Sequence, residues 1–151
     1  MLVQNSVLGQ VEVDSADILH LPDGLYGFES KGDFAIIKAL EEDVTLTWLQ
    51  PIDSKSPCFV VFDPFEIISN YAPALEQSDM KYLGASSVSD LNFWVIAVVP
   101  EDMAETTVNL KSPIIVNKKT RRARQVILQN QDYPIKFPLF PSEQPTGEAQ
   151  P

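Results

Sequence analysis

The fold is decided by the stretch Phe34-Ala35-Ile36-Ile37-Lys38-Ala39-Leu40-Glu41-Glu42-Asp43-Val44-Thr45-Leu46-Thr47-Trp48-Leu49. Its first half, residues 34–40, is an apolar run interrupted by a single lysine, which is typical of a buried strand. The acidic residues 41–43 mark a turn. In the second half, Val44, Leu46 and Trp48 alternate with threonines, as in a half-buried strand. The stretch therefore predicts a β-hairpin.

Short apolar runs on either side of this hairpin predict further strands. They are the region of Val7, Val11 and Val13 and residues 58–62, 65–68, 91–99, 106–110, 112–117 and 123–129. Pro64 ends one of these runs because a proline cannot donate to a strand ladder. About eight to ten short strands separated by proline and acidic turns predict a mainly β fold. We expect a compact, antiparallel, β-barrel-like single domain.

One segment has helical spacing. Pro73 suits a first helical turn, and Leu75, Met80 and Leu83 leave one apolar side on the segment that follows. This pattern predicts one short helix. Residues 101–105 are predicted to form a connection with one helical turn.

The composition changes after residue 137, where prolines occur among serine, glutamate, glutamine, threonine and glycine. Such a segment has too few apolar side chains to fold against a core. We therefore predict a domain at residues 1–137 and a disordered, proline-rich tail at residues 138–151.

The chain is acidic, with a formal net charge of −10 and a sequence pI of about 4.4. Residues 1–110 hold 18 acidic and 4 basic side chains, whereas residues 111–151 hold 3 and 7. This charge repels nucleic-acid backbones and favours basic partners. The basic run 118–124 has two interpretations, an RNA contact or a solvated turn with an edge strand protected by charge. The acidity of the other residues favours the second.

Motifs for chemistry are missing from the sequence. His20 is the only histidine and no Gly-x-Ser-x-Gly turn accompanies it, so we expect a structural role. Cys58 is the only cysteine, which excludes an internal disulfide, and its apolar neighbours predict a buried, unreactive thiol. Gly24 and Gly27 have no phosphate-loop spacing and are expected to supply positive φ in a turn. We predict no catalytic, cofactor-binding or metal-binding residues, and thus no enzyme.

The N-terminal residues lack a basic segment followed by a long apolar one, so no signal peptide is predicted. The longest apolar run, Phe93 to Val99, is far shorter than the ~20 residues that a membrane helix needs. A cytoplasmic protein is therefore expected.

Four stretches, in this order, resemble the flagellar assembly factor FliW family. The early turn Leu21-Pro22-Asp23-Gly24-Leu25-Tyr26-Gly27-Phe28-Glu29 is similar to that family's Leu-Pro-Gly-x-x-Gly-Phe-Glu turn, with Asp23 as a departure. The second stretch runs from Trp48-Leu49-Gln50-Pro51 through Cys58-Phe59-Val60-Val61-Phe62-Asp63-Pro64. The third and most specific is Val108-Asn109-Leu110-Lys111-Ser112-Pro113-Ile114-Ile115-Val116-Asn117, with serine where the family usually has alanine. The fourth is Ala123-Arg124-Gln125-Val126-Ile127-Leu128, followed by Tyr133-Pro134.

The resemblance implies a protein that binds CsrA, a basic dimeric RNA-binding repressor of flagellin translation, and that also binds flagellin in competition with it. For CsrA, the expected contacts are the exposed acids Asp63, Glu66, Glu101, Asp102 and Glu105. For the amphipathic helices of flagellin, the expected contacts are Tyr71, Leu75 and Leu83. Asn109 and Asn117 are expected to satisfy backbone groups at strand ends.

Two other classes of function stay open at this point. One is a small-molecule-binding β-barrel or a hydrolase without a known motif, which paired carboxylates at a barrel mouth or loss of a catalytic rate on replacing His20 would support. The other is RNA binding through residues 118–124.

Overall fold

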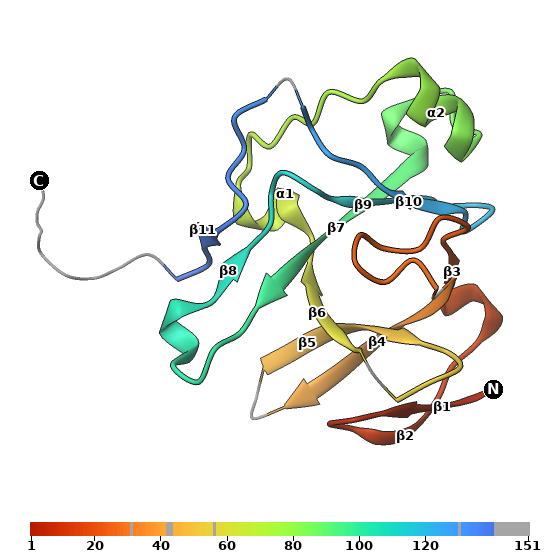
Figure 1. The fold of residues 1–151 in the computed structure, drawn as a ribbon, viewed down its shortest axis with the longest axis vertical. Coiled ribbons are helices and arrows are strands. Elements are labelled where there is room, and N and C mark those ends of the chain that lie inside the picture. The colour runs from red at the N-terminus through yellow and green to blue at the C-terminus, as the bar shows by residue number, and fades with distance from the viewer. Residues whose placement is uncertain (31, 42–43, 56, 130, 141–151) are drawn as a thin grey trace, which may run out of the picture.

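The computed structural model describes residues 1–140 except 31, 42–43, 56 and 130. The strands are β1 (Leu2–Asn5), β2 (Gly9–Glu12), β3 (Ile18–His20), β4 (Asp33–Glu41), β5 (Val44–Pro51), β6 (Phe59–Phe62), β7 (Leu91–Val98), β8 (Thr107–Val108), β9 (Ile114–Asn117), β10 (Ala123–Gln125) and β11 (Phe137–Pro138). The helices are α1 (Pro64–Ile67) and α2 (Gln77–Leu83), with short 3-10 turns at Ser15–Asp17, Val88–Asp90 and Met103–Glu105. The mainly β, antiparallel class is thus confirmed (Figure 1).

The predicted hairpin is the longest pairing in the main sheet. β4 and β5 pair antiparallel from Phe34 opposite Pro51 to Glu41 opposite Val44. The sheet then runs in the order β10-β9-β7-β6-β5-β4-β3, with β8 and β11 attached to the end of β7. Its register follows the sequence pattern, since a shift by one residue would move every apolar side chain to the opposite face.

The two ends of this sheet curl towards each other. The backbone N–H of His20, on β3, donates to the carbonyl of Arg121 at 2.9 Å, and His20 forms an isolated parallel bridge with Arg122. The contact gives the sheet a barrel-like curvature, although the strands are not closed into a continuous barrel.

Three hydrophobic clusters fill the molecule. The barrel core consists of Leu19, Leu21, Leu25, Phe34, Leu49, Val61, Ile114, Val116 and Ala123. The α2 core consists of Tyr71, Leu83, Leu91, Phe93, Val95, Ala97, Val108, Leu110, Ile115, Val126 and Leu128. The hairpin core consists of Val3, Val13, Ala35, Ile37 and Trp48. Each fully buried large apolar side chain contributes roughly 1.5–3 kcal/mol, so these clusters dominate the stability.

The central strands divide their side chains between two cores, which explains why their sequences are continuously apolar. On β4, Phe34 enters the barrel core, whereas Ala35 and Ile37 enter the hairpin core. On β9, Ile114 enters the barrel core and Ile115 the α2 core. Successive side chains of a strand point to opposite faces, so burial of both faces needs apolar residues at every position.

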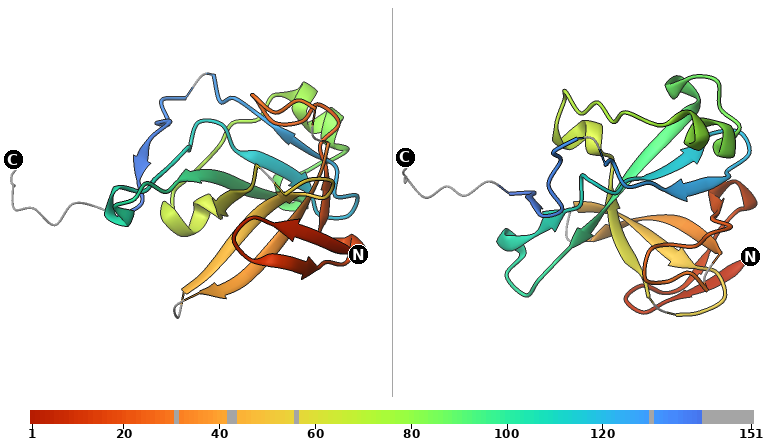
Figure 2. Two further views of the ribbon diagram at one scale, coloured as in Figure 1. Left: turned by 60° about the horizontal axis from the view of Figure 1, so that its bottom comes forward. Right: turned by 45° about the horizontal axis from the view of Figure 1, so that its top comes forward.

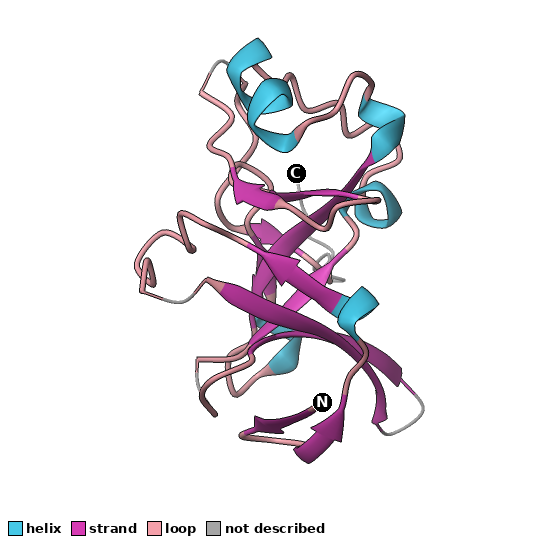
Figure 3. Ribbon diagram, turned by 90° about the vertical axis from the view of Figure 1, so that its right-hand side faces the viewer, coloured by secondary structure: helices cyan, strands magenta, loops and turns pink. Residues whose placement is uncertain are grey.

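The separate β1–β2 hairpin covers the outer face of β4 and β5 (Figure 2). It is anchored by Val3, which is 1% exposed, and by a buried hydrogen bond from Asn5 Nδ2 to Gln50 Oε1 at 3.0 Å. Figure 3 shows this hairpin and α2 at opposite ends of the molecule.

Two segments differ from the sequence predictions. Residues 65–68 were expected to be extended, but α1 occupies Pro64–Ile67, because Asp63 caps the first turn and Pro64 is preset for a first helical position. The predicted helix begins at Gln77 rather than at Pro73, and it ends at Gly84 in the left-handed conformation.

Residues just beyond the predicted domain boundary at residue 137 still contact the domain. Pro138 pairs with Thr107, and the N–H of Leu139 donates to Thr106 O at 2.9 Å. Leu139 also packs against the α2 core. The rest of the predicted tail, residues 141–151, lies outside the described residues.

Candidate functional site

The predicted CsrA contacts fall into two groups, and the first lies on α1. Asp63 is half-buried and its Oδ1 accepts a hydrogen bond from the backbone N–H of Phe65 at 2.9 Å. Glu66 is exposed on the same helical turn. Asp63 is therefore partly occupied in capping α1, and Glu66 is the carboxylate that faces solvent here.

The second group lies in the loop that joins β7 to β8. Glu101, Asp102 and Glu105 are all exposed. Asp102 Oδ1 accepts from the N–H of Ala104 at 3.1 Å, which fixes the 3-10 turn at Met103–Glu105 as the predicted single helical turn. The side chains of Glu101 and Glu105 have no ion-pair or hydrogen-bond partner among the described residues.

The structure does not bring the two groups together. The ring of Phe65, on α1, packs edge-to-face against Phe93 at a centroid distance of 5.4 Å, near the start of β7. The acidic loop follows Val98, at the other end of the same strand (Figure 1). Two separate acidic surfaces result, one at each end of β7.

Two of the predicted flagellin contacts are core residues, which corrects the expectation that they face a partner. Tyr71 is 3% exposed and Leu83 is 1% exposed. The Tyr71 hydroxyl donates to the carbonyl of Leu110 at 2.8 Å, and burial, together with the neighbouring Tyr133, raises the pKa of Tyr71 above its ordinary value. Leu75 is half-buried and packs at the edge of the same core. Sequence periodicity identified an apolar side but could not say that it faces inward.

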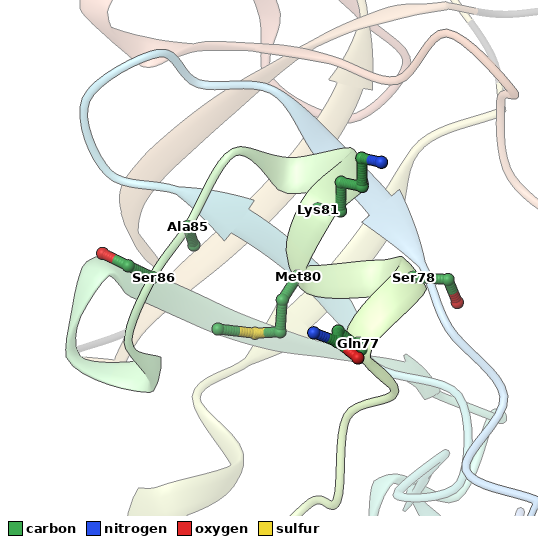
Figure 4. A pocket seen from close by; sticks show the side chains of 6 residues that line it. All are labelled: Gln77, Ser78, Met80, Lys81, Ala85 and Ser86. Carbon is green, nitrogen blue, oxygen red and sulfur yellow. The ribbon is translucent and has the colours of Figure 1, made fainter.

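A shallow, open hollow of about 670 Å³ lies beside α2. It is lined by Gln77, Ser78, Met80, Lys81, Ala85 and Ser86. Figure 4 shows the side chains of Met80 and Gln77 on one side of the helix, below Lys81. Met80 is half-buried and packs against the α2 core, so it gives this mainly polar hollow an apolar contact.

Two of the three arginines of the basic run are held by the protein itself. The guanidinium groups of Arg122 and Arg124 both lie 4.2 Å from the ring centroid of Tyr82. Arg124 also forms ion pairs with Asp79 at 3.3 Å and with Asp23 at 3.7 Å. Because β10 is an edge strand of the sheet, this arrangement fits the interpretation of a charged edge better than that of an RNA contact.

The asparagines and glycines of the sequence motifs have backbone roles, as predicted. Asn109 Oδ1 accepts from the N–H groups of Lys111 and Ser112, at 3.0 and 3.1 Å. Gly24 has a φ of 68°, and a Cβ there would lie 2.6 Å from the Cα of Glu29. Gly27 also has a positive φ, of 89°.

His20 and Cys58 are both more accessible than core residues. His20 Nδ1 lies 3.0 Å from Asp33 Oδ1 across the β3–β4 pair, at the surface. Cys58 is half-buried, less than the sequence suggested, and its Sγ lies 3.1 Å from Ser6 Oγ. Neither residue adjoins one of the acidic surfaces by any recorded contact in the described part of the chain.

The described residues contain neither a metal-ligand cluster nor a membrane-spanning helix. No three histidine, cysteine, aspartate or glutamate side chains within residues 1–140, apart from the five omitted positions, are grouped as metal ligands. No helix in the same part of the chain has the length and apolar character needed to span a membrane.

Comparison with known proteins agrees on one family. The family model described as "FliW protein" matches residues 2–139. The flagellar assembly factor FliW of Ruminiclostridium cellulolyticum is 35% identical over 136 residues, which cover 90% of this chain and 92% of that protein. The one from Caldanaerobacter subterraneus subsp. tengcongensis is 37% identical over 132 residues, which cover 87% and 88%. A crystal structure of the flagellar assembly factor FliW superposes with a TM-score of 0.84 at 28% identity, covering 95% of this chain and 99% of that one.

Proposed function

This chain belongs to the FliW family of flagellar assembly factors, and from that membership we propose that it regulates flagellar assembly by binding two proteins in competition. One is the translational repressor CsrA and the other is flagellin. Binding of CsrA relieves repression of flagellin translation, and free flagellin displaces CsrA. Export of flagellin then releases the factor to bind CsrA again. The protein acts by binding in the cytoplasm, with no chemical step.

The observation that carries this proposal is the family match, which spans residues 2–139 and thus almost the whole described chain. The fold supports it, because the crystal structure of a flagellar assembly factor FliW superposes with a TM-score of 0.84 over 95% of this chain. The net charge of −10 also suits a basic partner. Attraction between opposite charges accelerates encounter and weakens as salt rises.

For CsrA, the proposed contacts are the acids at the two ends of β7, which are Asp63, Glu66, Glu101, Asp102 and Glu105. Of these, Glu66, Glu101 and Glu105 present exposed carboxylates that are not used in capping a helix. A bound acidic protein would also repel RNA from the surface of CsrA, since like charges near a binding groove lower the affinity for a polyanion.

For flagellin, the proposed surface is the hollow beside α2, with Leu75 and Met80 as its apolar contacts. Both are half-buried, so each retains surface for a partner. Tyr71 and Leu83 support this surface from beneath as part of the α2 core. An amphipathic helix of flagellin could place its apolar side against such a surface.

Isothermal titration calorimetry with purified CsrA and purified flagellin tests the proposal. We expect both proteins to bind, the CsrA complex to weaken as salt is raised, and flagellin to displace CsrA from a preformed complex. Absence of binding to both proteins would reject the proposed function. Binding of both without competition would reject the regulatory cycle but not the individual interactions.

Two charge reversals and one introduced charge separate the proposed surfaces. Glu66→Lys and Glu101→Lys should each weaken CsrA binding, because each replaces an attractive carboxylate with a repulsive amine. Met80→Lys should weaken flagellin binding and leave CsrA binding unchanged. Far-ultraviolet circular dichroism of each variant provides the control for correct folding.

A further inference from the structure

The end of β7 carries an apolar face that the protein leaves uncovered. Along this strand, Trp94 and Ile96 are half-buried and pack against the barrel core. Val98 continues the same face, since side chains two apart in a strand point the same way. Val98 is not among the residues packed against the barrel core, and it is 63% exposed.

Neighbouring residues extend this apolar face. Val60 pairs with Ala97, so the preceding residue Phe59 lies beside Val98 on the same side of the sheet. The ring of Phe59 packs edge-to-face against that of Phe28 at 5.4 Å, and Phe28 itself is 39% exposed.

The loop after β7 adds two more apolar side chains. Val99 is 44% exposed and Met103 is 59% exposed. We call Phe28, Val98, Val99 and Met103 the tip patch. Phe28 is linked to Val98 through Phe59, and Val99 and Met103 follow Val98 within five residues of the chain. Exposed apolar side chains are common when scattered, but a group of them that lies close together can mark an interaction site.

Acidic residues adjoin the tip-patch residues along the chain. Glu29 follows Phe28 directly, and Glu101, Asp102 and Glu105 lie in the same loop as Met103, all of them exposed. The sequence contains no lysine or arginine between Lys81 and Lys111, so no basic residue of β7 or of this loop neutralises them.

The loop is held in one shape before any partner arrives. Thr106 is 3% exposed, and its Oγ1 donates to the carbonyl of Met103 at 2.7 Å. The N–H of Leu139 in turn donates to Thr106 O at 2.9 Å, which ties the loop to the C-terminal segment. A preorganised loop loses little conformational entropy on binding, which favours affinity.

We propose that the tip patch is the anchoring part of the surface that binds the basic partner, and that it takes a protein segment in which lysine or arginine side chains flank an exposed apolar one. The inference rests on the proposed function, and it assigns the main binding energy to the β7–β8 end of the molecule rather than to α1. Apolar contacts at the centre of an interface carry most of its energy, while surrounding charges set the rate of encounter and the orientation.

The charges distinguish this partner from three others. Nucleic acid and anionic lipid surfaces would be repelled by the four exposed carboxylates that adjoin these residues along the chain. A second copy of the chain, docked symmetrically, would place the same acids against each other. A cationic, partly apolar protein segment satisfies both the charge and the exposed apolar surface.

The test compares matched substitutions in the full-length protein by titration calorimetry with CsrA as the probe. Met103→Lys should raise the Kd by roughly tenfold or more, which corresponds to the loss of one hot-spot contact. Val7→Lys is the matched control, because Val7 and Met103 are both 59% exposed and Val7 lies in the β1–β2 turn. The control should change the Kd less than twofold, roughly the effect of an exposed charge outside an interface.

A second variant separates apolar anchoring from charge. Met103→Ala leaves the net charge of the protein unchanged and shortens the apolar side chain. It should therefore also raise the Kd at high salt, where screening suppresses the long-range electrostatic attraction. If Met103→Lys and Met103→Ala both bind CsrA like the unmodified protein while Glu66→Lys does not, the tip patch is rejected and the proposed function stands. If the unmodified protein binds no CsrA, both fail. Sedimentation showing a dimer that Met103→Lys dissociates would also overturn the inference, because the patch would then be a self-interface.

Discussion

The side-chain amide of Asn117 donates a hydrogen bond to the carbonyl oxygen of Leu83 at 2.8 Å, which ties the end of β9 to the end of α2. Its Oδ1 accepts from the backbone N–H groups of Lys119 and Thr120, at 2.9 and 3.1 Å. Asn117 is 6% exposed, so its side chain is satisfied mainly by these protein groups. One residue thereby positions both the helix beside the proposed flagellin surface and the turn before β10.

Asn117→Asp should destabilise the protein by about 1–3 kcal/mol, because the amide donor to Leu83 is lost and a carboxylate is placed against a carbonyl oxygen. Asn109→Asp is the matched control. Asn109 uses only its Oδ1, towards Lys111 and Ser112, and its amide has no recorded acceptor among the described residues. Urea denaturation monitored by circular dichroism should show a large decrease in midpoint for the first variant and a small change for the second. Equal effects would contradict the role assigned to the Leu83 contact.

Gly24→Ala should destabilise the protein more than Gly9→Ala. Both glycines have positive φ, 68° and 79°, so alanine costs roughly 1–2 kcal/mol of backbone strain at each position. At Gly24 a Cβ would also lie 2.6 Å from the Cα of Glu29, whereas at Gly9 it would meet nothing within 4 Å. The comparison of the two unfolding midpoints therefore isolates the steric contribution, about 1–3 kcal/mol. Similar midpoints would mean that the turn at residues 24–29 opens without cost.

Tyr71→Phe should reduce stability at neutral pH by about 1–3 kcal/mol, through loss of the hydrogen bond to Leu110 O. The difference in stability between this variant and the unmodified protein should become smaller at alkaline pH. Burial raises the pKa of Tyr71 in the folded protein above the ordinary value of 10.0, so the contribution of the neutral phenol is complete below pH 10.0 and is lost as the pH rises further towards the folded pKa. Urea unfolding of both proteins at neutral pH and at a pH above 10.0 tests this expectation. A constant difference across this range would show that the phenol titrates normally.

Arg124 and Asp79 should show positive coupling in a double-mutant cycle. Asp79 is 9% exposed and its Oδ1 lies 3.3 Å from Arg124 Nη1. Arg124→Gln leaves this carboxylate without its partner and should cost about 1–3 kcal/mol, while Asp79→Asn combined with Arg124→Gln should cost less than the sum of the single changes. Free energies of unfolding from urea titration give the coupling. Simple additivity would show that the ion pair contributes nothing beyond the contact of Arg124 with Tyr82.

The sequence predicted those parts of the fold in which local pattern and tertiary burial agree. The hairpin of residues 34–49 was recognised because its turn is acidic and its second strand alternates, and the two strands pair antiparallel as predicted. The signal for α1 was also present, as an aspartate before a proline. That pair serves equally to end a strand, and only the packing of Phe65 against Phe93 decides between the two.

The candidate site was less predictable than the fold. A helical period identified Leu75, Met80 and Leu83 as one side of a segment, but whether a side faces the core depends on the sheet behind it. Here β7 and β9 bury Leu83 and leave Leu75 at the edge. The grouping of Phe28 with Val98 was also inaccessible from sequence, because it depends on the pairing of β6 with β7 and on the contact between Phe28 and Phe59.

The pairing of β11 with β8 has a consequence for the order in which the protein matures on the ribosome. Phe137 and Leu139 complete the α2 core, yet they are synthesised after every other residue of that core. Until they emerge, Val108 has no β11 partner and part of this core is open to water. A chain that emerges from its N-terminus onwards can assemble the barrel core early. The surface beside α2 is completed last, because the residues that pack beneath it are synthesised last. Competence to bind a partner there should thus follow the emergence of residues 137–139, so a nascent chain stalled before them would not sequester that partner.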